Sequence, residues 1–438
     1  MSGFEMGLLL FVVTLLAVAL RMPVGLSMFF FGAIGYVMLV GWPPLINTLN
    51  NSTYSRFSSY TLSVVPLFLL MGQFATKAGL NRALFRAASA WFGHMRGGLA
   101  IASVGGCAMF GAICGSSLAT AATMSQVALP EMRRYGYSDA LSTGTLAAGG
   151  TLGILIPPSV ILVIYAVYTE QSIGHLFLAA LIPGIIATIG YMIVVSIYVR
   201  FAPDAGPAAE RQPWREKFAS LQQIWPAALV FILVVGGIYL GWFSPTEGAA
   251  IGAAAVGVLA FMFGGMRWRD LRACLVDTAE TTALIFLILM GAEIFNAFLA
   301  LSQMPQELGQ VVGELNAPPI LIIIAMLVIY ILLGCVMDAL AMVLLTMPVF
   351  YPIVSSLDLG LTPDQVGVWF GILALMAVEM GMITPPFGLN IFVINAMAED
   401  IPMNKTFKGV LPFVVSDFFR LAIILFIPAT ALYLPGMM

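Results

Sequence analysis

The sequence predicts an all-α polytopic membrane protein built from two inverted-topology repeats, and three observations support this. Hydrophobic residues make up 61% of the 438-residue chain and charged residues 9%, against about a half and a quarter in soluble domains. The pattern Gly-x-x-x-Pro-Pro occurs twice, at 153–158 and 381–386. Nearly all of the basic residues can be placed on one side of a membrane. We therefore expect a chain that is inserted in a lipid bilayer.

Apolar segments of about 20 residues, long enough to cross a bilayer, recur along the chain. The expected spans are residues 4–20, 24–41, 60–78, 140–168 and 175–200 in the first half and 225–242, 247–265, 276–300, 365–398 and 408–434 in the second. The first segment lacks the basic residues that precede a signal peptide's apolar core, so we expect it to be retained as a span. Two further apolar segments, about 98–130 and 318–355, each carry a polar interruption at the centre.

The two Pro-Pro pairs, Pro157-Pro158 and Pro385-Pro386, lie inside long apolar runs. Proline cannot donate the helical hydrogen bond and clashes with the preceding turn. Each of these spans should therefore consist of two half-helices with an unwound middle. Broken helices in corresponding positions of two halves point to a transporter's binding site.

Basic residues set the expected orientation, because cytoplasmic loops carry the excess of Lys and Arg. Suppose that the N-terminus is outside and that each interrupted segment is a re-entrant hairpin. All of the 18 basic residues except Arg56 and Arg420 then fall inside. The hairpin at 98–130 enters from the cytoplasm and the hairpin at 318–355 from the periplasm. Both termini are expected to be periplasmic.

A polar linker at 201–224 divides the chain near its midpoint. We expect a first repeat at 1–200 and a second repeat at 225–438, each with five spans and one hairpin. Matches at a nearly constant offset support the division: Pro23 with Pro245, Met71-Gly72 with Met290-Gly291, and Cys114 with Cys335. Inverted repeats of this kind place the binding site at the bilayer midplane, between the halves.

The tip of the first hairpin offers small polar residues, Gly115, Ser116 and Ser117, and a Gly149-Gly150-Thr151 run precedes the first Pro-Pro pair. Irregular backbone is tolerated in a bilayer only where it is buried in protein or lines a cavity. Hydroxyl and carbonyl oxygens at such places are hard ligands for a small cation. The alternative is that these small residues only let helices pack closely.

The second hairpin carries Asp338 in an apolar setting, and the Cys114–Cys335 match places this residue opposite Ser117. A carboxylate inside a membrane is costly, which makes it a functional candidate. Asp338 could alternatively be a structural partner for a backbone amide or for Arg420. The second broken span adds Gly381, Thr384 and Asn390, and Glu379 before its Pro-Pro pair is either an ion ligand or structural.

Motifs of catalysis are missing from the sequence, which has no Walker loop, no HExxH and no GxSxG. We expect no enzyme activity and no cofactor. The net charge of -3 does not indicate a basic surface for binding nucleic acid. The isolated histidines make a metal pair improbable, and a channel is disfavoured because the polar sites are closed hairpin tips. Without an ATP site, active transport must draw on an ion gradient.

These residues resemble the large membrane subunit of tripartite ATP-independent periplasmic (TRAP) transporters. The resemblance covers essentially the whole chain. It rests on the Cys-Gly-Ser-Ser tip at 114–117, the motifs Gly-x-x-x-Pro-Pro-Ser at 153–159 and Gly-x-x-x-Pro-Pro-Phe-Gly-x-Asn at 381–390, and the Ser-Pro-Thr-Glu turn at 244–247.

The resemblance implies a sodium-coupled secondary active importer, a symporter with an elevator-type ion-transporter architecture in the bacterial inner membrane. Its partners would be a small four-span membrane subunit and a periplasmic binding protein that delivers a small organic acid. Sodium ions would be the only metal. A stand-alone sodium–dicarboxylate carrier of related architecture is the nearest alternative, and co-purification of a four-span subunit would separate the two.

The resemblance also implies positions for the ions and the substrate. The residues of sodium site 1 would be Gly115, Ser116, Ser117, Gly150, Thr151 and Gly153. Those of sodium site 2 would be Asp338, Gly381, Ile383 and Thr384. Ser117 and Asn390 are the expected substrate contacts.

Overall fold

The computed structural model describes residues 2–314 and 317–437, and over these residues the chain forms helices, turns and loops without a strand. The expected all-α fold is therefore confirmed. Within this described part, six helices are long and apolar enough to cross a membrane, or up to nine if each of three bent helix pairs is one span.

The helices of the first half are α1 (Gly3–Ala19), α2 (Val24–Val40), α3 (Trp42–Phe57), α4 (Val64–Lys77), α5 (Leu80–Phe92), α6 (Gly98–Cys114), α7 (Ser117–Arg134), α8 (Asp139–Leu155), α9 (Val160–Thr169) and α10 (Ile173–Phe201). Those of the second half are α11 (Trp214–Gln223), α12 (Trp225–Phe231), α13 (Gly237–Tyr239), α14 (Pro245–Met262), α15 (Trp268–Ser302), α16 (Met304–Glu314), α17 (Pro319–Gly334), α18 (Ala339–Ser356), α19 (Pro363–Ile383), α20 (Leu389–Met397), α21 (Met403–Phe426) and α22 (Ala429–Leu432).

The helices α3, α5, α11 and α16 lie outside the expected spans. They have mixed rather than continuous apolar sequence, which a search for long apolar runs misses. The helix α11 occupies part of the segment 201–224, so this linker is not simply loop. Its Trp214 and Phe218 pack edge-on against Trp91 of α5. Arg56 belongs to α3, but its side chain lies outside the described residues.

Both expected helix breaks are present. The helix α8 ends at Leu155 and α9 begins at Val160, with a bend of 41° between the two. The hydroxyl of Ser159 caps α9 by accepting a hydrogen bond from the amide of Leu162. In the second half α19 ends at Ile383 and α20 begins at Leu389, so five residues between them are not helical. Both Pro-Pro bonds are cis.

Each interrupted apolar segment folds as a helix–turn–helix, α6–α7 and α17–α18. At the first turn Gly115 has a φ of +66°, a left-handed conformation that favours glycine. The second helix of each pair starts on a capping side chain, because Ser116 accepts from the amide of Ala119 and Asp338 from the amide of Ala341. The caps thus relate Asp338 to Ser116, one residue before the partner expected from the cysteine match. Re-entrant insertion of these hairpins stays a prediction.

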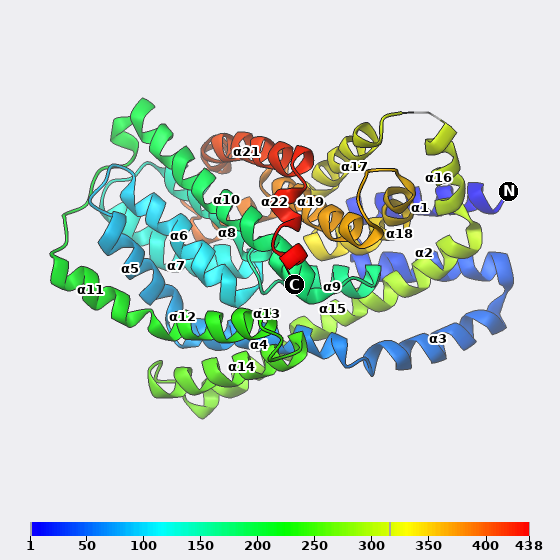
Figure 1. Ribbon diagram of the computed structural model, residues 1–438, viewed down its shortest axis with the longest axis horizontal. Helices are drawn as coiled ribbons and strands as arrows, with labels where there is room; N and C mark the ends of the chain where they lie inside the picture. Colours follow the sequence, from blue (N-terminus) through cyan, green and yellow to red (C-terminus); the bar gives the residue numbers. More distant parts are fainter. Residues whose placement is uncertain (1, 315–316, 438) are drawn as a thin grey trace.

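Long helices of the first half pack against long helices of the second half. The helix α2 packs along α15, and α14 packs along α4. These contacts are close because the first helix of each pair presents glycine: a Cβ on Gly25 would lie 2.9 Å from Ile288 Cα, and one on Gly257 would lie 3.0 Å from the ring of Phe74. In Figure 1 the helices α14 and α3 lie along the lower side of the molecule, with α6 and α7 at the left and α17 and α18 at the right. This reciprocal packing is compatible with the expected repeat.

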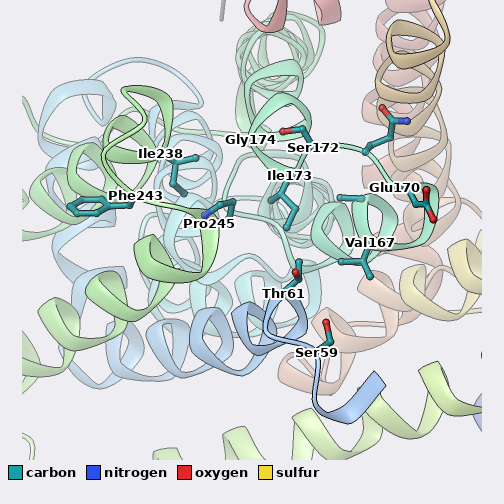
Figure 2. A pocket seen from close by; sticks show the side chains of 12 residues that line it. Ser59, Thr61, Val167, Glu170, Ser172, Ile173, Gly174, Ile238, Phe243 and Pro245 are labelled. Atoms are coloured by element: carbon teal, nitrogen blue, oxygen red, sulfur yellow. The ribbon is translucent and has the colours of Figure 1, made fainter. Parts of the chain in front are cut away.

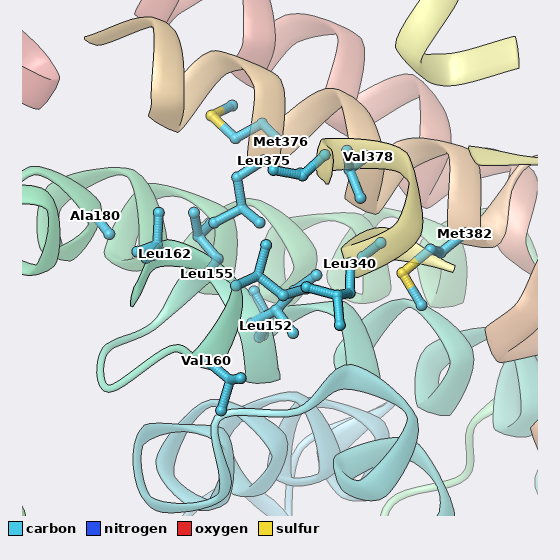
Figure 3. Packing of buried hydrophobic residues seen from close by; sticks show 14 of the residues in the cluster. Leu152, Leu155, Val160, Leu162, Ala180, Leu340, Leu375, Met376, Val378 and Met382 are labelled. Atoms are coloured by element: carbon cyan, nitrogen blue, oxygen red, sulfur yellow. The ribbon is translucent and has the colours of Figure 1, made fainter. Parts of the chain in front are cut away.

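The core lies where the two broken helices meet. Figure 3 shows Leu152 and Leu155 of α8 and Val160 of α9 beside Leu340 of α18 and Leu375 of α19. All five side chains are buried. Each broken helix is thereby packed against elements of the other half of the chain, which brings the two breaks into one compact region.

Candidate functional site

The first hairpin tip is seated directly on the first helix break. A Cβ added to Gly111 of α6 would lie 2.6 Å from Gly153 Cα of α8, so the two backbones cross at these glycines. A Cβ on Gly115 would lie 2.7 Å from the carbonyl oxygen of Pro158, and one on Gly153 would lie 2.7 Å from the carbonyl oxygen of Ser116. Three residues of the expected sodium site 1, Gly115, Ser116 and Gly153, therefore come together.

The second tip makes the equivalent contact with the second break. A Cβ on Gly334 of α17 would lie 2.8 Å from Gly381 Cα of α19. The Cys335 thiol lies 3.6 Å from the carbonyl oxygen of Pro385. Gly381 of the expected sodium site 2 thus touches the second hairpin. Its neighbour Ile383 is buried and offers only backbone oxygen.

The side chains of Asp338 and Thr384 bond to nearby backbone. Asp338 Oδ1 accepts from the amide of Ala341 at 3.0 Å, which is the backbone-amide alternative, and Thr384 donates to the carbonyl of Met380. The other alternative, a pair with Arg420, is wrong, because Arg420 pairs with two other carboxylates. Asp338 as a whole residue is partly exposed.

The two expected substrate residues touch each other. Ser117 and Asn390, 273 positions apart, are both buried and make two side-chain contacts: Asn390 Nδ2 donates to Ser117 Oγ at 2.7 Å, and Ser117 Oγ lies 3.0 Å from Asn390 Oδ1. Asn390 Nδ2 also donates to the carbonyl of Ala147 at 3.1 Å. This group joins the first hairpin, the first broken helix and the second broken helix at one point.

The remaining expected residues of sodium site 1 point in different directions. A Cβ on Gly150 would lie 2.6 Å from Ala121 Cβ of α7 and 3.2 Å from Asn390 Nδ2, so Gly150 faces the hairpin. The Thr151 hydroxyl instead donates to the carbonyl of Ala148 and lies 3.3 Å from the Tyr191 hydroxyl. Only the backbone of Thr151 is therefore available to an ion at the tip.

Thr120 was not foreseen as part of this site. Its hydroxyl is buried next to the Cys114 thiol and next to the position that a Gly153 Cβ would take. Thr120 follows Ser116 by four residues, so both lie on one face of α7. That helical spacing from the polar tip is the sequence signal that could have identified it.

A buried ion cluster lies beside the two breaks. Arg420 Nη2 of α21 donates to Glu379 Oε2 of α19 at 3.1 Å and lies 3.2 Å from Asp417 Oδ1. Tyr191 of α10 donates to Asp417 Oδ2 at 2.8 Å. Glu379 thus has a structural partner. The pattern of apolar spans in the sequence did not indicate that Asp417 and Tyr191 would join this cluster.

Two cavities lie elsewhere in the structure, and no expected site residue lines either of them. One of about 520 Å³ is bordered by Ser59 and Thr61 ahead of α4, by Glu170 and Ser172 in the α9–α10 turn, and by Phe243 ahead of α14. Figure 2 shows these segments facing a common space.

The other cavity, of about 890 Å³, is bordered by α5, α7 and α11 and by the segment ahead of α11. Its lining mixes both signs of charge, with Arg82, Arg86 and Arg134 beside Glu131 and Glu216. It does not share residues with the region of the helix breaks.

Ion pairs at the end of α7 and the start of α8 hold this region to the α20–α21 connection and to the first turn of α21. Arg133 Nη2 donates to Asp400 Oδ1 at 2.7 Å, and Lys405 Nζ donates to Asp139 Oδ2 at 2.8 Å. The hydrogen bond from Arg133 lowers the pKa of the Asp400 carboxyl. Because these side chains are solvent-accessible, each pair is expected to contribute little to stability.

Discontinuous helices whose breaks meet hairpin tips inside a helical membrane protein are the architecture of a secondary transporter. A solved structure with the same fold is the YdaH transporter of Alcanivorax borkumensis, with a TM-score of 0.63 and 15% sequence identity over 96% of this chain and 97% of that one. At this identity the likeness concerns the fold alone.

Sequence comparisons are more specific. The large permease protein of a C4-dicarboxylate TRAP transporter from Pseudomonas aeruginosa is 36% identical, over 90% of both chains. The large permease protein of a sialic acid TRAP transporter from Vibrio cholerae is 32% identical, over 94% of this chain and 95% of that one.

The family model described as "Tripartite ATP-independent periplasmic transporter, DctM component" matches residues 11–430. The chain belongs to this family. It is a multi-pass membrane protein and a transporter permease subunit, not an enzyme, and it works in a secondary transporter that depends on a substrate-binding protein.

The glycine crossing at the first break generates a stability prediction. Gly111→Ala should destabilise the protein by about 1–3 kcal/mol, because the new methyl group meets the backbone of Gly153. Gly105→Ala, in the same buried helix, meets only the flexible end of Met192 and gains helix propensity of up to about 1 kcal/mol. Thermal unfolding of the two purified variants checks this, and equal melting temperatures would contradict the close crossing.

Proposed function

We propose that this chain is the ion-coupling subunit of a sodium-driven importer, and that it moves a small organic acid inward. The observation that carries the proposal is that each of two hairpin tips is seated on one of two helix breaks. Unwound backbone at such places exposes carbonyl oxygens that coordinate sodium in transporters with broken helices. Active transport by this chain then requires an inward sodium gradient.

The first sodium site lies where Gly115, Ser116 and Gly153 meet. Its ligands are backbone carbonyls of the tip and of the α8 end, together with hydroxyls. Thr120 joins this set, because its buried oxygen faces Gly153. Ser117, Gly150 and Thr151 line the same region, Thr151 through its backbone. A set of neutral oxygens suits a hard monovalent cation.

The second sodium site lies between the α17–α18 tip and the α19 break. Gly381, Ile383 and Thr384 supply oxygens on one side, and Asp338 supplies the charge on the other. Asp338 Oδ1 accepts the capping hydrogen bond of α18, and a bound cation would take the second carboxylate oxygen. One site thus relies on neutral oxygens and the other includes a carboxylate.

Substrate is proposed to bind at Ser117 and Asn390. These two side chains are hydrogen-bonded to each other in this structure. A bound organic acid would instead accept hydrogen bonds from their hydroxyl and amide donors. The two relatives named above transport a C4-dicarboxylate and sialic acid, and both solutes are carboxylic acids. We therefore favour a carboxylate substrate.

Movement is proposed to follow an elevator mechanism. The hairpins and broken helices form one packed unit, since α8 contacts α6, α7, α19 and α21. The helix pairs α2–α15 and α4–α14, in each of which a helix of one half packs against a helix of the other, form the surface against which this unit would slide. The Ser117–Asn390 contact would travel with the unit, because both residues belong to it.

The small membrane subunit with four spans and a periplasmic binding protein complete the proposed transporter in the bacterial inner membrane. A stand-alone sodium–dicarboxylate carrier is the alternative. Reconstitution separates them: the large chain alone should be inactive in liposomes, and addition of both partners should restore uptake. Full uptake by the large chain alone would favour the stand-alone carrier.

The proposed orientation predicts opposite accessibility for two exposed positions in a cysteine-free background. A cysteine at Ala208 should react only with reagents that reach the cytoplasm, and a cysteine at Gly313 only with reagents added to the periplasm. Both positions are exposed or uncrowded, so both should label when the membrane is opened. Labelling of the two from one face would contradict the orientation.

Sodium coupling predicts a specific effect of Asp338→Asn. Asparagine is as good a helix N-cap as aspartate, so α18 should stay capped while the charge at the second site is lost. Loss of one charge–cation contact should raise the half-saturating sodium concentration about tenfold. The measurement is the initial uptake rate of the carboxylate against sodium concentration, with choline replacing sodium. Asp358→Asn, in the loop at 357–362 between α18 and α19, is the control variant.

Uptake that persists undiminished in choline would end the sodium proposal. An unchanged sodium dependence in Asp338→Asn would remove that carboxylate from the second site, whereas a lowered melting temperature alone would assign its charge a structural role.

The substrate contact predicts different effects of two substitutions in α20. Asn390→Ala and Asn395→Ala each remove an amide that bonds a carbonyl and a hydroxyl, so both should lower the melting temperature. Only Asn390→Ala should raise the KM for the transported acid, by about tenfold for one lost hydrogen bond. Succinate and sialic acid are the first probes, and equal KM values in the two variants would contradict the assignment.

A further inference from the structure

A continuous chain of buried polar side chains runs from one helix break to the other. Thr151 Oγ1 of α8 lies 3.3 Å from the Tyr191 hydroxyl, which donates to Asp417 Oδ2 at 2.8 Å. Asp417 Oδ1 lies 3.2 Å from Arg420 Nη2, which donates to Glu379 Oε2 of α19 at 3.1 Å. The guanidinium carbon of Arg420 is also 5.8 Å from the centre of the Tyr191 ring. Four helices are joined by these contacts.

Both ends of this chain of polar side chains, Thr151 and Glu379, lie next to the proposed ion sites. Thr151 lies between Gly150 and Gly153, in the segment that faces the first hairpin tip. Glu379 lies one helical turn before Ile383, where α19 ends at the second break. A shift of either helix end must therefore change a contact at the corresponding end of the polar chain.

These polar groups are deeply buried, with exposed fractions of 0% for Thr151, Glu379 and Asp417 and 3% for Arg420. Ionisable residues inside a membrane are costly and mark functional positions. Removal of one partner from a buried ion pair leaves an uncompensated charge, so the cluster holds its members together strongly. A cluster of this kind transmits displacement between the helices that carry it.

The hydrogen bonding of the cluster is incomplete. Arg420 Nε and Nη1, Glu379 Oε1 and Asp417 Oδ1 have no hydrogen-bond partner among the residues that the structure describes. Donors and acceptors are therefore left over on both sides of the guanidinium. A rotation of Arg420 would exchange partners within the cluster and would give the second arrangement that energetic coupling between two sites requires.

We propose that the polar chain Thr151–Tyr191–Asp417–Arg420–Glu379 couples the two sodium sites, so that occupancy of one raises the affinity of the other. This inference rests on the proposed sodium coupling. Tyr191, Asp417 and Arg420 act as positioning residues: Tyr191 contacts the side chain of Thr151, whose backbone is proposed to face the ion, and Asp417 and Arg420 contact no residue proposed to bind an ion or the substrate. Sodium activation of uptake is then cooperative, with a sigmoidal dependence on concentration.

The substitution Tyr191→Phe tests the central link. It removes the hydroxyl that bridges Thr151 and Asp417 and keeps the ring, which packs edge-on against Phe413 with centroids 5.4 Å apart. The matched control is Tyr165→Phe, which removes a buried hydroxyl that donates to the carbonyl of Gly367 at 2.6 Å. Both variants lose buried hydrogen bonding, and only the first interrupts the polar chain.

The measurement is the initial uptake rate against sodium concentration, in proteoliposomes that contain the complete transporter. Wild type and Tyr165→Phe should give sigmoidal curves. Tyr191→Phe should give a Hill coefficient of about 1 and an increase of about fivefold in half-saturating sodium, the lower end of typical coupling between sites. A double variant with Asp417→Asn should match Asp417→Asn alone, because both changes interrupt the same chain.

The outcomes separate this inference from the proposed function. Uptake unaffected by choline in wild type would refute sodium coupling itself. Sodium-dependent uptake that is hyperbolic in wild type, or sigmoidal in Tyr191→Phe, would refute only the coupling chain. If Tyr165→Phe also lost the sigmoidal dependence of uptake on sodium, the effect would be a general loss of packing, and the inference would be overturned as well. Asp417→Asn alone provides the same test if Tyr191→Phe does not fold.

Discussion

The backbone polar groups at the two helix breaks are the constraint on which the rest of the structure depends. A proline pair removes amide donors and ends the helical bonding, and in a bilayer each unpaired group costs several kcal/mol. Such backbone is stable only inside protein. The fold meets this requirement by seating the α6–α7 tip on the break at Pro158 and the α17–α18 tip on the break at Pro385.

Glycine makes this arrangement possible. The crossings of Gly111 with Gly153 and of Gly334 with Gly381 bring helix backbones closer than any side chain would allow. The same closeness gathers carbonyl oxygens from the tip and the break around a small volume. The contacts that bury the irregular backbone are thus the same contacts that would form the proposed cation sites. The hydrogen bonds between Ser117 and Asn390 then join the two halves at this place.

Features that depend on local sequence were predictable, and those that depend on three-dimensional packing were not. The proline pairs specified both breaks, and the polar tips specified both hairpin turns. The contact of Ser117 with Asn390 was foreseen only as a shared role, since no local pattern relates residues 273 positions apart. The amphipathic helices α3, α5, α11 and α16 were missed because they lack long apolar runs. The pairing of Arg420 with Glu379 and Asp417 was missed because burial decides it, and burial is a property of the packed helices.

The central claim is that two seated hairpin tips make two sodium sites, and equilibrium binding of radioactive sodium to the purified transporter tests it most directly. The wild-type complex should bind sodium saturably at two sites in the absence of substrate. Gly111→Val, which displaces the first tip, and Gly334→Val, which displaces the second, should each leave one site. Absence of saturable binding, or an unchanged number of sites in both folded variants, would contradict the account.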